Sequence, residues 1–379
     1  MSIPEATVSE FVETFSKIYA RAVEQEKLAR LPAVFLWGTY GIGKSQSAFQ
    51  LRDNLQKRTG KKVDVIDVML LLYGPVDLKG NPVANREDHV TDWYIPKKFK
   101  LDPSPDLLHI IQFDELVSAP PTIQAAANSI ILDGKIDDYQ IPRHNTIFLA
   151  TGNRSVDRAV TYTMPEPLAN RFSHWEIHAD YKTWKHWAEH NGVDDRILRF
   201  LDFDSSRLIT EPEDDQLMNN SWDDRLAVPR PRTWEFVSHF LELTEDQPEM
   251  QRKIIASCVG IETAEEYFHF IRTSDQIPDL GEILAGNCTR APKSPDALYM
   301  LVQSLTNYIR HEPALSYDAF ENAVLYLKNY APQDYLKAFL LDIYKMHEHW
   351  SKLEYIRDPV VRRMMKKMKL ELEDEDDFS

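Results

Sequence analysis

The segment Gly38–Ser45 has residue types and a spacing that suit phosphate binding. It reads Gly-Thr-Tyr-Gly-Ile-Gly-Lys-Ser and matches the P-loop pattern G-x-x-x-x-G-K-[ST] in full. Its glycines let the backbone wrap closely, so that successive N–H groups point at phosphate oxygens at the positive end of a helix. Lys44 would reach the β- and γ-phosphates, and Ser45 would place its hydroxyl on Mg²⁺. The residues expected to contact the nucleotide are those of the loop and the one that follows it: Gly38, Thr39, Tyr40, Gly41, Ile42, Gly43, Lys44, Ser45 and Gln46.

A second candidate element is the apolar run Leu107–Phe113, which leads into the carboxylates Asp114 and Glu115. In nucleotide hydrolysis one acid holds the magnesium shell, and another can polarise the water that attacks the γ-phosphate. We therefore predict that Asp114 shares the metal with Ser45, and that Glu115 is the catalytic base. Strand ends often carry Asp or Glu, so Asp114 and Glu115 point to a catalytic role only because a P-loop precedes them. The distance between them leaves room for an intervening strand.

Three further positions are candidates for the same site. Asn153 follows the apolar run Thr146–Ala150, and ligand sites in parallel sheets lie at the carboxyl ends of strands, so its amide can orient the attacking water. Arg171 comes just after the expected nucleotide core, where it could stabilise charge on a neighbouring subunit's γ-phosphate. An arginine in Val228–Trp234 opens a later helix and could touch the nucleotide across a domain cleft. For both arginines, the ordinary alternative is a plain surface residue.

The elements that must position these residues alternate in type up to about residue 180. An amphipathic helix is expected within Ala6–Leu28, where apolar residues recur at helical spacing. Short apolar runs then predict buried strands at Ala33–Trp37, Val63–Val68, Leu107–Phe113 and Thr146–Ala150, with helices between them. This pattern predicts an α/β core with helices on both faces of a parallel sheet. We expect a five-stranded sheet, of which these runs locate four strands. From about Tyr181 onward the pattern is helical throughout.

Composition and charge narrow the class of function. The 379 residues include 44 Lys and Arg against 60 Asp and Glu, which gives a net charge of −16. A protein that mainly covers nucleic-acid phosphate needs a net positive surface, so this balance argues against that role. Two cysteines, no visible secretory signal and no apolar run long enough to span a bilayer predict a cytoplasmic protein.

The motifs, taken in order, resemble those of the AAA+ ATPases. The series is GTYGIGKS, LLHIIQFDE, ATGN, PLANRF and PRPRTWEF. The MoxR-like branch, also known as the AAA_5 or dynein-related group, is the most similar. The stretch Asp77–Pro82 looks like its Asp-x-x-Gly-x-Pro segment, and Gly134–Pro142 looks like its hairpin before the sensor strand.

The resemblance implies a role for each matching residue. Lys44 and Ser45 would belong to the Walker A motif, and Asp114 and Glu115 to Walker B. Asn153 would be sensor 1 and Arg171 the arginine finger. Sensor 2 would be Arg232, which matches the family's Pro-Arg-Thr-Trp better than Arg230 does.

The resemblance also implies a domain plan, an oligomer and a partner. Members form rings, usually hexamers, and are thought to act as chaperone-like remodellers of proteins, often beside a partner with a von Willebrand factor A domain. ATP and Mg²⁺ are the implied cofactors. The expected divisions are an N-terminal amphipathic helix (1–30), the AAA+ nucleotide-binding core (31–180), a helical lid (181–248), a helical C-terminal region (249–369) and an acidic tail (370–379).

Two other functions stay open at this stage. A nucleic-acid motor or restriction-type NTPase from a neighbouring AAA+ branch would need a basic channel, and the sequence shows only short basic clusters. A nucleotide-gated scaffold would bind but hardly turn over, and Glu115 argues against it. The acidic tail is either a solvated segment or a docking segment for a partner.

Overall fold

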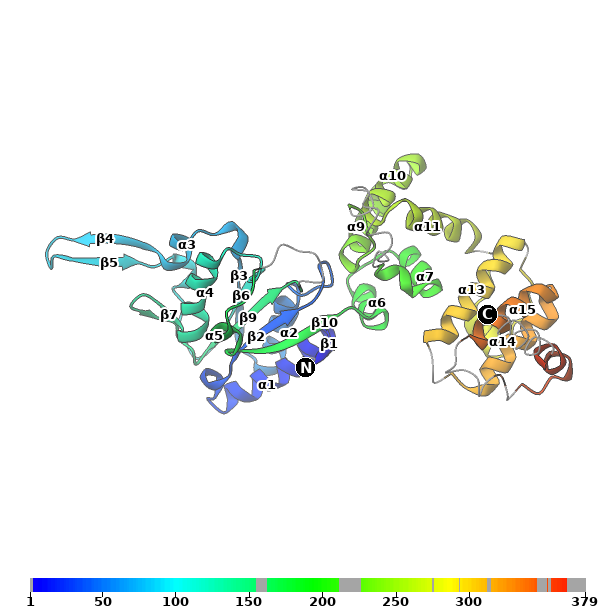
Figure 1. Ribbon diagram of the computed structural model, residues 1–379, viewed down its shortest axis with the longest axis horizontal. Helices are drawn as coiled ribbons and strands as arrows, with labels where there is room; N and C mark the ends of the chain where they lie inside the picture. Colours follow the sequence, from blue (N-terminus) through cyan, green and yellow to red (C-terminus); the bar gives the residue numbers. More distant parts are fainter. Residues whose placement is uncertain are drawn as a thin grey trace, which may run out of the picture. The chain divides into compact units, whose positions relative to one another are not determined.

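The computed structural model describes residues 3–154, 162–210, 226–274, 276–292, 294–311, 315–345, 353 and 356–366. The chain divides into two compact units, Met1–Trp187 and Ala188–Ser379 (Figure 1). The acidic tail lies outside the described residues.

The first unit is built on a six-stranded parallel sheet in the order β1-β10-β2-β9-β6-β3. Its central strands are almost wholly buried, as a parallel sheet covered on both faces requires. The strands are β1 (Glu5–Thr7), β2 (Ala33–Trp37), β3 (Lys62–Met69), β6 (Leu107–Asp114), β9 (Thr146–Gly152) and β10 (Phe172–His178). The predicted α/β fold with a parallel sheet is confirmed. Four of its strands lie at the predicted runs, and β10 and β1, which no predicted run located, complete the six.

The helices that connect these strands lie on opposite faces of the sheet. The chain moves from β2 to β3 in one direction across the sheet and from β6 to β9 in the other. Because crossovers between parallel strands are right-handed, α2 (Ser47–Thr59) and α4 (Pro121–Asp133) must cover different faces. Helix α1 (Val8–Glu24) packs on α2, and α4 buries its apolar residues in the main core. Phe35, Ile111 and Phe148 supply the sheet side of that core.

Two antiparallel hairpins leave the sheet-and-helix core. One consists of β7 (Lys135–Ile136) and β8 (Tyr139–Gln140) and lies where the sequence predicted a hairpin. The other consists of β4 (Asn81–Asn85) and β5 (Val90–Tyr94), follows the short helix α3 (Pro75–Lys79), and extends away from the sheet (Figure 1). The sequence predicted irregular structure here, because Gly80 and Pro82 read as turn residues and the strands lack an apolar face.

The second unit is helical, as predicted. Phe200 and Trp234 form the centre of its first part, with Tyr267 packed edge-on against Phe200. The helices of the region are α6 (Tyr181–His190), which begins in the first unit, α7 (Asp195–Phe203), α9 (Pro231–Leu243), α10 (Pro248–Val259), α11 (Ile261–Ser274), α12 (Leu280–Leu284), α13 (Pro295–His311), α14 (Tyr317–Tyr330) and α15 (Gln333–Tyr344). No helix among the described residues has the length and apolar character needed to cross a membrane.

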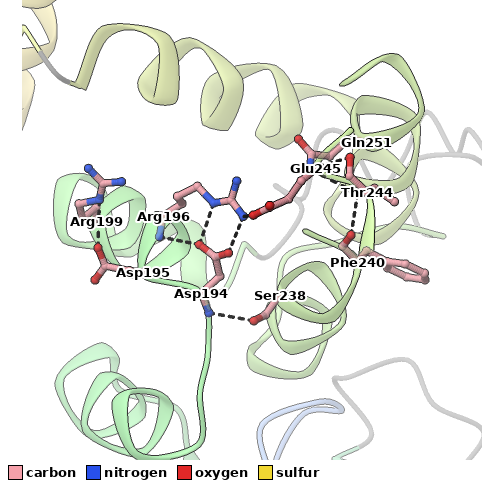
Figure 2. A network of polar contacts seen from close by, with 9 residues as sticks. All are labelled: Asp194, Asp195, Arg196, Arg199, Ser238, Phe240, Thr244, Glu245 and Gln251. Carbon is pink, nitrogen blue, oxygen red and sulfur yellow. Dashed lines mark hydrogen bonds and ion pairs between the residues drawn. The ribbon is translucent and has the colours of Figure 1, made fainter. Parts of the chain in front are cut away.

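A polar network around Asp194 joins the first helices of this unit (Figure 2). Asp194 caps α7 by accepting from the backbone N–H of Arg196 at 2.8 Å, and it also accepts two bonds from the Arg196 guanidinium at 2.9 and 2.6 Å. Its own N–H donates to Ser238 of α9 at 2.8 Å. Burial alone would raise the pKa of Asp194, but the hydrogen bonds and charge of Arg196 outweigh it and hold that pKa below its usual value. The network therefore stabilises the ionised carboxylate.

Candidate functional site

The P-loop occupies the turn between β2 and α2, at the carboxyl end of the central strand. Gly38 is the residue that leaves β2, with φ of 148°. A Cβ there would lie 2.4 Å from the carbonyl oxygen of Ile177, so only glycine fits between the loop and β10. This close approach keeps the loop against the sheet edge while its backbone turns toward the helix.

Lys44 lies in the centre of the loop with its side chain almost fully buried. It is 6% exposed, and its Nζ donates to the carbonyl oxygens of Gly38 and Thr39, each at 2.7 Å. The same ammonium donates to Oδ1 of Asn153 at 2.9 Å. The predicted Walker A lysine and sensor residue, 109 positions apart in the sequence, are therefore in direct contact.

Ser45 and Asp114 form the second contact of the site. The Ser45 hydroxyl lies 3.0 and 2.9 Å from the two carboxylate oxygens of Asp114, to which it donates. Thr151, at the end of β9, donates a short hydrogen bond to the same carboxylate. Asp114 is buried, and the hydroxyls of Ser45 and Thr151 donate to its carboxylate. A cation beside it would balance the charge of this buried group.

The oxygens of Ser45 and Asp114 fit a magnesium ion. Mg²⁺ prefers oxygen ligands, is commonly held by one or two carboxylates, and keeps several waters. No group of three or more His, Cys, Asp or Glu side chains suited to a metal occurs within the described part of the chain. A site with one carboxylate and one hydroxyl suits a nucleotide-bound magnesium, because phosphate oxygens and water would supply its other ligands.

Glu115 is held by two polar neighbours and has an unusual backbone. Asn153 Nδ2 donates to its two carboxylate oxygens at 3.1 and 3.0 Å, and Ser118 donates to one of them at 2.7 Å. Its φ of 57° lies in the left-handed region, which a residue with a Cβ enters at a cost of about 1–2 kcal/mol. The turn is held because the N–H of Leu116 donates to the carbonyl of Thr151 at 2.9 Å. Such strain is found where the surrounding structure fixes a functional side chain.

Five of the predicted residues are thus brought together by three neighbouring strands. They are Lys44, Ser45, Asp114, Glu115 and Asn153. The strand order places β9 between β2 and β6, so that Asn153 reaches both Lys44 of the P-loop and the carboxylate of Glu115.

Arg171 is not part of this cluster. Its side chain is exposed, and it precedes Phe172, which pairs with Ala33 at the amino end of β2. The P-loop follows the other end of that five-residue strand, about 16 Å away at the rise of a β-strand. Arg171 therefore lies at the amino ends of these strands, whereas the P-loop of its own chain follows their carboxyl ends.

Arg230 and Arg232 belong to the second unit and differ in their surroundings. Arg230 is 3% exposed, precedes α9 as its N-cap, and donates to the carbonyl of Thr210 at 2.9 Å. Arg232 is exposed in the first turn of α9. Arg230 thus has a structural role, and the contact of Arg232 with the nucleotide stays a prediction.

The sequence did not predict several polar residues around the site. Thr151 and Ser118 hold the two carboxylates, and each lies within two or three residues of a predicted position. Gln112 donates from Nε2 to the carbonyl of Ser45 at 3.2 Å and to Asp67 at 3.4 Å. Asp67, on β3, could be found only from the pairing of that strand with β6.

Comparisons with known proteins find similarity in fold. The chain is similar to a candidate ATPase from Cytophaga hutchinsonii, with 14% identity, 85% of this chain and 78% of that chain covered, and a TM-score of 0.28. It is similar to the ORC2 protein of Aeropyrum pernix at 11% identity, with 91% and 88% covered and a TM-score of 0.40. For PCH-2 of C. elegans the identity is 14%, both chains are 70% covered, and the TM-score is 0.37.

No family model and no curated sequence matches the chain. Since the TM-scores of these three structures lie below 0.5, the functional argument rests on the residues of the site.

Proposed function

We propose that this chain is a magnesium-dependent ATPase of the AAA+ type, which works as a ring-shaped oligomer and remodels a protein partner. The observation that carries the proposal is the contact of Asn153 with both Lys44 and Glu115. One amide joins the residue that would bind the phosphates to the residue that would activate water. A P-loop alone would support binding only, whereas this connection supports hydrolysis.

Lys44 and the P-loop would bind the nucleotide. The lysine ammonium is already aimed into the loop by the carbonyls of Gly38 and Thr39. A β- or γ-phosphate oxygen carries more negative charge than a carbonyl and would compete for the same ammonium protons. Lys44 would then stabilise the charge that develops on the γ-phosphate during transfer.

Glu115 would act as the base and Asn153 would orient the attacking water. The Asn153 amide fixes the carboxylate of Glu115, and Ser118 fixes one of its oxygens further. A carboxylate held in this way can accept a proton from water beside the γ-phosphate. Ser45 and Asp114 would hold Mg²⁺, which neutralises phosphate charge when it is bound.

Arg171 supports an oligomeric enzyme. Arg171 lies at the amino ends of the strands, and its own P-loop follows their carboxyl ends. Its exposed guanidinium is therefore better placed to contact the nucleotide of a neighbouring copy. We propose that it is the arginine finger of a homo-oligomeric ring, for which a hexamer is the expected size. Arg232 would contribute to the same nucleotide from the second unit as sensor 2.

A protein client fits the charge of the chain better than a nucleic acid does. The net charge of −16 opposes binding to a phosphate backbone. The MoxR-like branch, a partner with a von Willebrand factor A domain, and a cytoplasmic location are the finer parts of the proposal. They rest on the resemblance of the sequence motifs.

The first test is phosphate release from ATP in the presence of Mg²⁺. The wild-type chain should hydrolyse ATP, and Lys44→Ala should reduce the rate by about 100-fold or more, because the positive charge that would stabilise the phosphates is removed. Lys57→Ala is the matched control, since Lys57 is an exposed lysine on the helix that follows the P-loop. Equal rates for wild type and Lys44→Ala would overturn the proposal.

The second test separates the finger and the client. Arg171→Ala and Lys44→Ala chains, each inactive alone, should recover part of the activity when they are mixed, because one supplies the finger and the other the P-loop. Absence of recovery in verified mixed oligomers would contradict a finger that acts between subunits.

A severalfold stimulation of ATPase activity by DNA or RNA that is lost at high salt would favour a nucleic-acid motor instead.

A further inference from the structure

A carboxylate outside the predicted motifs lies beside the metal site. Asp67 is on β3, directly opposite Gln112 of β6, and two residues further along these strands Met69 is opposite Asp114. Side chains two residues apart on a strand point to the same face. Asp67, Gln112 and Asp114 therefore share the face of the sheet from which Ser45 approaches.

Gln112 connects Asp67 to the P-loop. Its Nε2 lies 3.4 Å from Oδ1 of Asp67 and 3.2 Å from the carbonyl oxygen of Ser45. The Gln112 side chain is fully buried, and its Oε1 has no hydrogen-bond donor among the described residues. A buried amide oxygen without a donor is unfavourable, and a bound water molecule is the usual solution.

We propose that Asp67 is a positioning residue of the magnesium site, which accepts hydrogen bonds from water bound to the cation while Gln112 ties it to Ser45. The inference rests on the proposed nucleotide site and adds a residue to it. Mg²⁺ gives up its water reluctantly, so a nucleotide-bound magnesium presents several water protons to its surroundings. A carboxylate and an unoccupied amide oxygen on the Asp114 side of the site suit those protons.

The charges around Asp67 agree with such a role. The side chain of Asp67 is exposed in the part of the chain that the structure describes, as expected of a residue at an open site. Partial desolvation and the negative charge of Asp114 raise its pKa, and the hydrogen bond from Gln112 and the charge of Lys98 only partly oppose this. A divalent cation held by Ser45 and Asp114 would favour the ionised form of Asp67.

The test measures how strongly Mg²⁺ and nucleotide assist each other's binding. The affinity for a fluorescent, non-hydrolysable ATP analogue is measured in saturating Mg²⁺ and in EDTA, and the ratio of the two dissociation constants gives the coupling. Asp67→Asn keeps the size of the side chain and one oxygen. It should lower the coupling by about tenfold, the effect typical of residues around metal ligands, while the affinity in EDTA stays unchanged.

Asp64→Asn is the matched control. Asp64 lies on the same strand, three residues away and so on the opposite face, and its contact with Lys62 at 3.1 Å is exposed. This variant should keep the wild-type coupling. The Tm in EDTA provides the structural readout, and Asp67→Asn should unfold at the wild-type temperature or above it.

The outcomes distinguish the role of Asp67 from the nucleotide site on which it rests. Wild-type coupling in Asp67→Asn, or a lowered Tm that accounts for its weaker binding, would overturn the role of Asp67 and leave the nucleotide site intact. A wild-type chain that binds the analogue equally well in Mg²⁺ and EDTA, or not at all, would contradict the proposed function itself.

Discussion

The two units contain carboxylates in opposite electrostatic settings. In the second unit, Asp194 caps a helix and pairs with Arg196, and the pKa of Asp194 is lowered because its ionised form gains from these neighbours. In the first unit, Asp67 is exposed and lies on the same sheet face as Asp114, and partial desolvation and that like charge raise the pKa of Asp67. Asp194 has a positively charged partner within the chain, whereas Asp67 and Asp114 place two like charges on one face of the sheet. The difference separates a network that stabilises the fold from one that is suited to bind a ligand.

The same contrast extends to the backbone. Asp194 precedes a regular helix with φ of −55° and ψ of 128°, at the negative φ that residues with a side chain ordinarily adopt. Glu115 has φ of 57°, and the contacts with Asn153 and Ser118 hold it there. The strained backbone thus lies directly after β6, at the residue for which we propose base chemistry.

The largest expected effect concerns Glu115. Glu115→Gln should reduce ATP hydrolysis by about 100-fold or more, because the amide cannot accept the proton of the attacking water. Nucleotide affinity and Tm should stay close to wild type, since the amide has the same shape. The check is phosphate release under saturating ATP and Mg²⁺. A rate close to wild type would show that another residue is the base.

Asp194 should behave in the opposite way. Asp194→Ala removes the helix cap and the partner of Arg196, and should lower the free energy of unfolding by about 1–2 kcal/mol. ATP hydrolysis below the unfolding transition should change less than twofold. Urea denaturation and the ATPase rate measure the two quantities. A large loss of activity in a fully folded variant would remove the distinction between the two networks.

The smallest effect is the pH dependence of stability, measured as Tm in EDTA. Because the folded-state pKa of Asp194 is lowered, its stabilisation is present above its unfolded-state pKa of about 3.9 and is lost as the pH falls through the folded-state value. The Tm deficit of Asp194→Asn should therefore be full at pH 7 and shrink only below about pH 4.

For Asp67 the sign is reversed. Its folded-state pKa is raised, so its contribution is most favourable below the unfolded-state value and is lost as the pH rises through the folded-state value. Any Tm gain of Asp67→Asn should appear near pH 7 and disappear toward about pH 4. A gain that grew on acidification would contradict the unfavourable setting of this carboxylate.

The sequence predicted the parts of the fold and site that have a strong local pattern. The strand β2 has the predicted bounds, Ala33–Trp37, and the cluster of Lys44, Asp114 and Asn153 follows from motifs at strand ends. These succeed because a buried parallel strand must be apolar throughout and because the carboxyl ends of such strands meet at one edge.

Other features depend on pairing that no local pattern records. The exposed strands of the β4–β5 hairpin have no apolar face, so the region from Tyr73 to Lys100 read as irregular. Asp67 lies beside the site only because β3 pairs with β6 in the observed register. The three-residue strand β1 gains its place from β10, far away in the sequence.

The most direct test of the account is calorimetry of Mg·ATP binding to the Glu115→Gln chain at equilibrium. The Lys44→Ala, Glu115→Gln double variant is measured for comparison. The first substitution stops turnover, so that binding can be measured on its own. The account predicts saturable binding at one site per chain, and at least about tenfold weaker binding when the Lys44 ammonium is removed. Equal affinity in the two chains, or no binding to either, would contradict a nucleotide site built around Lys44, Asp114 and Asn153.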